Sequence, residues 1–103
     1  MAKNEVIAIL RDYICLLRAE GISVDKAFLY GSYLSNSATA DSDIDLLIVT
    51  EDGKDDDKAG KIWNLTKKVS SKIEPFLVSK DRFYGNDRSP LVDLIKRTGF
   101  EIA

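Results

Sequence analysis

The sequence predicts an α/β (α+β) fold in which helices pack on a small mixed β-sheet. Segments with apolar residues at three-and-four spacing alternate with short apolar runs rich in β-branched residues, as the helices and strands of such a fold require. The 103 residues, of which 45% are hydrophobic and 31% charged, suffice for one core and leave little room for a second lobe. We therefore expect a single domain over residues 1–103.

The N-terminal segment predicts a helix. Asn4 can cap it, apolar residues follow at helical spacing, and Gly21 is a suitable stop. Cys15 is the only cysteine, which excludes an internal disulfide. Because it lies within the apolar pattern, we expect a packed thiol.

Two strands and a turn follow. Lys26 to Tyr30 predicts a short strand, and Gly31-Ser32 predicts a turn that opens a brief helix through Ser35. After a polar loop over residues 36–42, Ile44 to Val49 form a nearly continuous apolar run. Such a run is typical of a strand covered on both faces, and we expect it to be the central strand.

The second half predicts a helix and then a strand. Residues 55–70 show helical spacing, with Trp63 at an apolar core position. Ile73 to Val78 predicts a strand, in which Pro75 favours an edge position or a bulge because proline lacks the ladder donor.

The C-terminal segment predicts a last helix. After a polar loop that includes residues 85–87, Ser89 supplies an N-cap and Pro90 a first-turn proline. Gly99 ends this helix, and Phe100 to Ile102 allow a final short strand.

Composition excludes several classes of function. The absence of histidine rules out histidine zinc sites and Ser-His-Asp triads. A net charge of −2 and a pI near 5.1 give no general attraction for nucleic acid. Since no apolar run approaches the roughly 20 residues of a membrane span and no signal-type block follows the N-terminus, we expect a cytoplasmic protein without a membrane segment.

The residues best suited to chemistry surround the glycine turn and the following strand. Asp43 and Asp45 are two apart, so in a strand they project to one face, about 7 Å apart at the backbone. Two such carboxylates repel each other unless a divalent cation neutralises them, and Mg²⁺ prefers oxygen ligands. Gly31 lets the backbone approach a phosphate, while Ser32 offers a hydroxyl and an amide. Either motif alone is more often structural, but together they indicate metal-assisted phosphoryl transfer on a nucleotide.

These residues match a known pattern. Gly31-Ser32, ten intervening residues and Asp43-x-Asp45 before a hydrophobic strand resemble the signature of the nucleotidyltransferase superfamily related to DNA polymerase beta. With no helical second domain, the chain is similar to minimal nucleotidyltransferases, the MNT type of HEPN/MNT toxin–antitoxin pairs. The resemblance implies a nucleotidyltransferase-like fold, ATP as donor and a two-Mg²⁺ site. Glu74 matches the family's third carboxylate, which shares a metal or accepts the proton of the attacking hydroxyl; the alternative is a solvated strand glutamate.

The chain departs from the family just after the turn. Many minimal members carry arginine and glycine there, where this chain has residues 33–37, Tyr-Leu-Ser-Asn-Ser. The charge of the triphosphate would then be neutralised by metals, by amides near Ser32, and by Lys80, Arg82 or Arg88. Each of these three basic residues is also explained as an ordinary surface charge.

The resemblance implies transfer of AMP from ATP to a hydroxyl of a HEPN-domain protein, with the chain acting as the antitoxin. The alternative is a binding module that neutralises a HEPN-type partner by occlusion, with catalysis weak or lost. Transfer to a small molecule such as an aminoglycoside would need a surface for the acceptor, which a homo-oligomer could supply in place of an added domain.

Overall fold

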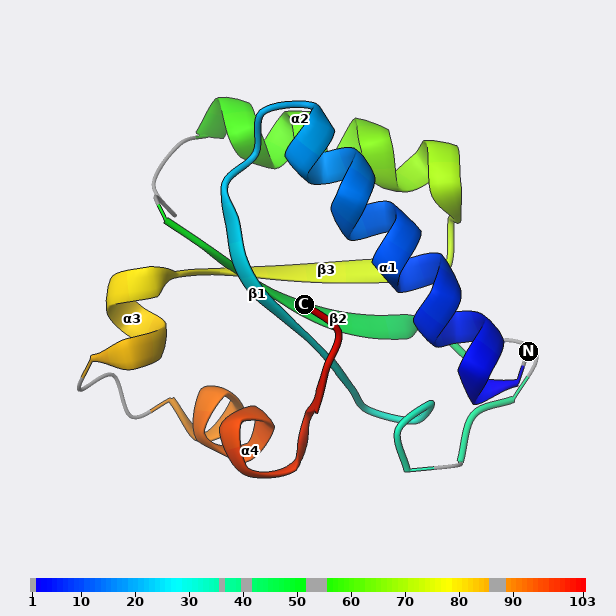
Figure 1. Ribbon diagram of the computed structural model, residues 1–103. Coiled ribbons are helices and arrows are strands. Elements are labelled where there is room, and N and C mark those ends of the chain that lie inside the picture. The colour runs from blue at the N-terminus through cyan, green and yellow to red at the C-terminus, as the bar shows by residue number, and fades with distance from the viewer. Residues whose placement is uncertain (1, 36, 40–41, 52–55, 86–88) are drawn as a thin grey trace.

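The computed structural model describes residues 2–35, 37–39, 42–51, 56–85 and 89–103. Its centre is a four-stranded mixed sheet in the order β3-β2-β1-β4 (Figure 1). β1 pairs antiparallel with β2 and β4, whereas β2 and β3 run parallel. The strands are β1 (Val24–Tyr30), β2 (Ile44–Thr50), β3 (Ile73–Ser79) and β4 (Phe100–Glu101). The predicted small mixed sheet is confirmed, and β3 lies at an edge, as Pro75 indicated.

Helices cover both faces of the sheet. α1 (Lys3–Ala19) and α2 (Asp56–Val69) lie on one face, and the short α3 (Lys80–Tyr84) and α4 (Pro90–Thr98) lie on the other (Figure 1). β2 alternates between the two cores: Ile44, Leu46 and Ile48 face α1 and α2, whereas Leu47 and Val49 face α3 and α4. This double coverage is why its sequence is almost continuously apolar.

Two local predictions were wrong, one at the start of α1 and one at the turn after β1. α1 begins at Lys3 with Ala2 as its N-cap, so Asn4 is already helical. After Gly31 the chain forms a turn instead of a brief helix, in which the amides of Leu34 and Ser35 both donate to the Gly31 carbonyl.

Two residues expected in the core are exposed. Cys15 follows the buried Ile14 of α1 and, at about 100° per residue, is turned away from the buried stripe. Trp63 is 50% exposed beside the buried Ile62. The Lys67 ammonium lies 5.4 Å from the Trp63 ring centroid, a cation–π contact on the solvent side of α2.

α3 is an element that the sequence pattern does not predict. The Ser79 side chain caps α3 by accepting a hydrogen bond from the Arg82 amide at 3.3 Å. Phe83 is buried and stacks on Phe28 of β1, with ring centroids 5.4 Å apart. A five-residue helix of this kind depends on a distant aromatic partner.

In the part of the chain that the structure describes, no helix is both long and apolar enough to cross a bilayer.

Candidate active site

Strand pairing brings two of the predicted acids side by side. Asp45 of β2 stands opposite Glu74 of β3 in the parallel register. Asp45 shares its face with Leu47, and Glu74 shares its face with Val78, so both acids belong to the sheet face that carries α3 and α4. Leu47 and Val78 are buried, but Asp45 is half-buried and Glu74 exposed. The acids therefore lie at the end of this face that the two helices leave open.

Asp43 belongs to the same cluster. It precedes β2 by one residue and is exposed. Partial burial raises the pKa of the Asp45 carboxyl, and the negative charges of Asp43 and Glu74 raise that pKa further. Asp45 therefore lies close enough to both Asp43 and Glu74 for their charges to act on it.

The glycine turn lies directly against Asp45. Gly31 has φ +80°, a left-handed conformation that side chains rarely adopt. A Cβ at this position would collide with the Asp45 carboxylate, lying 3.0 Å from its Cγ and closer still to Oδ2. Glycine is required here because the turn and the acid share the same space. Ser32 follows half-buried, and its carbonyl accepts a hydrogen bond from the Ser37 amide at 3.0 Å.

Tyr30 is a site residue that sequence reasoning missed. It stands opposite Asp45 in the β1–β2 register, and it is half-buried. Burial raises the pKa of its hydroxyl, and the charges of Asp45 and Glu74 raise it further. The hydroxyl is therefore near the acids and remains a protonated donor at neutral pH. The available signal was strand parity, which places Tyr30 and Phe28 on one face.

A pocket adjoins this cluster. It has a volume of about 460 Å³ and mainly apolar walls. The sequence predicted α4 as a helix but did not predict that it approaches the Gly31 turn. The pocket between them was therefore also missed. Tyr30, Gly31, Leu34 and Ser35 line one side, and Leu94, Ile95 and Thr98 of α4 line the other.

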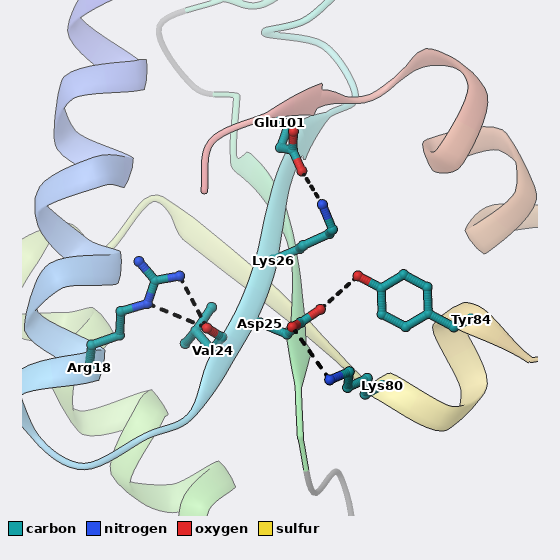
Figure 2. Close-up of polar contacts among 7 residues, drawn as sticks. All are labelled: Arg18, Val24, Asp25, Lys26, Lys80, Tyr84 and Glu101. Atoms are coloured by element: carbon teal, nitrogen blue, oxygen red, sulfur yellow. Dashed lines mark hydrogen bonds and ion pairs between the residues drawn. The ribbon is translucent and has the colours of Figure 1, made fainter.

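Of the basic residues considered for the triphosphate, Lys80 is paired away from the acids. Lys80 follows the opposite end of β3, where its ammonium lies 3.8 Å from the Asp25 carboxylate (Figure 2). Tyr84 donates to the same carboxylate at 2.7 Å. Arg82 lies on α3 with Lys80, and Arg88 is outside the described residues.

The donor set fits a magnesium ion in its chemistry. Asp43 and Asp45 at the start of β2 and Glu74 on the adjacent β3 supply carboxylate oxygens, and partial burial together with the charges of Asp43 and Glu74 raises the pKa of Asp45. Such a set favours a hard divalent cation. Among the described residues, no three His, Cys, Asp or Glu side chains are close enough together to hold one ion. Asp43 and Glu74 are exposed, and binding of one ion by all three acids would require their side chains to turn toward Asp45. These three are the residues that would hold the metal.

Comparison with known proteins adds the family. Residues 8–100 match a family model described as the nucleotidyltransferase domain, a range that includes all five predicted site residues. No curated protein matches the sequence significantly.

Among solved structures, the fold is similar to a candidate nucleotidyltransferase from Sulfolobus solfataricus, with TM-score 0.60, 10% identity, and coverage of 85% of this chain and 87% of that one. It is also similar to a toxin–antitoxin structure with AMP-PNP, with TM-score 0.59, 21% identity, and coverage of 100% and 73%. A mutant of the toxin–antitoxin MntA–HpeT gives TM-score 0.56, 19% identity, and coverage of 100% and 73%. At these identities the likeness is one of fold. The family match and the shared fold together show that the chain belongs to the family of nucleotidyltransferase domains.

Proposed function

We propose that this domain transfers a nucleoside monophosphate, AMP from ATP, to an acceptor hydroxyl and releases pyrophosphate. The observation that carries the proposal is the packing of the Gly31 turn against Asp45, with Glu74 opposite on the next strand. Family membership supports the reaction class. The open end of the sheet offers a triphosphate a glycine turn on one side and carboxylates on the other.

Each residue of the site has a proposed task. Asp43, Asp45 and Glu74 would hold Mg²⁺, which when bound neutralises charge on the phosphates and in the transition state. The hydroxyl and amide of Ser32 would bind the terminal phosphates. The Tyr30 hydroxyl, kept protonated by its raised pKa, would donate to a phosphate oxygen.

Bond changes in this reaction balance without a further reactant. The acceptor oxygen forms a bond to the α-phosphorus, and the bond from that phosphorus to the bridging oxygen breaks, so pyrophosphate leaves. The proton of the acceptor hydroxyl passes to a carboxylate. Glu74, which is exposed on the edge strand β3, is the carboxylate proposed to take it.

The acceptor in this proposal is a hydroxyl on a HEPN-type protein, and the chain is its antitoxin. The resemblance to minimal nucleotidyltransferases supports this, and two of the fold neighbours are toxin–antitoxin structures, one of them with AMP-PNP. The exposure of Asp43 and Glu74 also suits a macromolecular acceptor, because the reacting group can enter from outside.

A second candidate is neutralisation of the same partner by occlusion, with little or no catalysis. The observation that favours it is the lack of a basic residue in the Gly31–Ser35 turn, together with the pairing of Lys80 to Asp25 at the other end of the sheet. A triphosphate would then meet little positive charge from the protein.

Mass spectrometry of a co-expressed HEPN-type partner separates the two functions. The wild-type chain should add AMP to the partner, whereas Asp43→Asn with Asp45→Asn should add none and leave the complex intact on gel filtration. Asp12→Asn, at an exposed aspartate on α1, is the matched control and should behave as wild type. A double variant that still silences the partner without modifying it would favour occlusion.

A further inference from the structure

The α4 side of the pocket, formed by Leu94, Ile95 and Thr98, has no part in the phosphate chemistry above. One wall carries Leu94, which is 49% exposed although its helix neighbour Ile95 is buried. A single exposed leucine is ordinary on a protein surface. The position of this one, on the rim of an apolar pocket next to the acid cluster, is what requires an explanation.

The pocket and the acid cluster share residues. Tyr30 lines the pocket and stands opposite Asp45 in the β1–β2 register. Gly31 also lines the pocket and would touch the Asp45 carboxylate if it had a Cβ. A ligand with phosphates at the acids can therefore reach the pocket with its other end.

Two of the hydroxyls in the pocket wall, those of Thr98 and Ser35, already have local partners. Thr98 Oγ1 donates to the Leu94 carbonyl at 2.7 Å. Ser35 Oγ lies 2.8 Å from Ser37 Oγ and 3.4 Å from the Ser32 carbonyl oxygen, to which it can donate. Of the described residues that line the pocket, only Tyr30 adds a further side-chain hydroxyl. Such a pocket can contact the apolar faces of a ring, but it has few hydrogen-bond donors for the polar atoms at the edge of the ring.

We propose that this pocket holds the nucleobase of the donor triphosphate through ring-face contact with Leu94 and its neighbours. The inference rests on the proposed function, since it assumes that the triphosphate occupies the acid cluster. It follows that the site favours purines over the smaller pyrimidines and distinguishes adenine from guanine weakly, because apolar contacts reject a near-isosteric ring poorly. AMP transfer would then reflect the supply of ATP more than selection of its base.

Calorimetric titration in the presence of Mg²⁺ tests this with four probes: ATP, GTP, UTP and inorganic tripolyphosphate. The variants are Leu94→Ala, the conservative Leu94→Met, and Trp63→Ala. Trp63 is the matched control because it is as exposed as Leu94 but lies on α2, on the opposite sheet face. Circular dichroism melting confirms that each variant is folded.

The wild type should bind ATP and GTP within about threefold of each other, and UTP more weakly. Leu94→Ala should weaken ATP and GTP about five- to tenfold and leave tripolyphosphate unchanged. Leu94→Met should restore most of the loss, and Trp63→Ala should change nothing.

Three results would overturn the inference: unchanged ATP affinity in Leu94→Ala, an equal loss for tripolyphosphate, or a preference for ATP over GTP above about tenfold. If Leu94→Ala instead raised only the KM for the acceptor, the pocket would belong to the acceptor. Failure of the wild type to bind even tripolyphosphate would overturn the proposed function itself, and the two failures are thus distinguishable.

Discussion

Replacing Gly31 by alanine tests the contact on which the site is built. Gly31 and Gly21 both have positive φ, at +80° and +88°. An added Cβ meets nothing within 4 Å at Gly21, whereas at Gly31 it meets the Asp45 carboxylate. Gly21→Ala is therefore a matched control that carries the backbone strain without the collision.

The expected magnitudes follow from these geometries. Placing alanine in the left-handed region costs about 1–2 kcal/mol at either glycine. At Gly31 the Asp45 carboxylate must also leave its rotamer, which adds about 0.5–1.5 kcal/mol. Because the carboxylate then points elsewhere, we expect Gly31→Ala to weaken nucleotide binding with Mg²⁺ about 10- to 100-fold, the range seen when groups that orient a metal ligand are changed. Gly21→Ala should leave that affinity unchanged.

Urea denaturation and calorimetry measure both quantities. Combining Gly31→Ala with Asp45→Ala removes the two carboxylate atoms nearest the new Cβ, so the stability losses of the single variants should couple and not add. Equal destabilisation by Gly31→Ala and Gly21→Ala, with nucleotide affinity retained in both, would refute the reasoning.

Three further predictions concern charge, a buried hydrogen bond and a basic residue. The pKa of Asp45 is raised above 3.8 in the folded state, so ionisation of this carboxyl destabilises the fold as pH rises. Asp45→Asn should therefore have a higher melting temperature than wild type at pH 7, and this difference should vanish below pH 3.8. An equal difference at low pH would contradict the prediction. Thr66 donates to the Ile62 carbonyl, so Tyr13 donates to Thr66 Oγ1 at 2.6 Å. Thr66→Val, which leaves the buried Tyr13 hydroxyl unpaired, should cost about 1–3 kcal/mol in urea unfolding, more than Tyr13→Phe. Lys80→Ala should leave ATP affinity with Mg²⁺ unchanged in calorimetry, and a marked loss would return Lys80 to the site.

Local patterns predicted most of the fold because they report local physics. Apolar spacing located α1, α2 and α4, and the uniformly apolar β2 correctly indicated a strand covered on both faces. Pro75 correctly indicated an edge strand. Spacing marks a buried stripe but not its border, which is why Trp63 and Cys15 were misplaced.

The sequence by itself determined that two acidic residues lie near each other at the start of one strand. The two-residue spacing of Asp43 and Asp45 placed both acids at the start of β2, and the turn at Gly31 was visible from residue type alone. Glu74 was reached only through resemblance to a family; its position opposite Asp45 is set by the β2–β3 register.

Tertiary structure alone decided how separate segments meet. The collision that requires glycine at residue 31, the charge environment of Tyr30, and the pocket formed with Leu94 and Thr98 all depend on elements distant in sequence. α3 likewise depends on the stacking of Phe83 on Phe28. The physical reason is that periodicity reflects hydrogen bonding and burial along one element, whereas contacts between elements arise from packing of the whole core, which no single segment encodes.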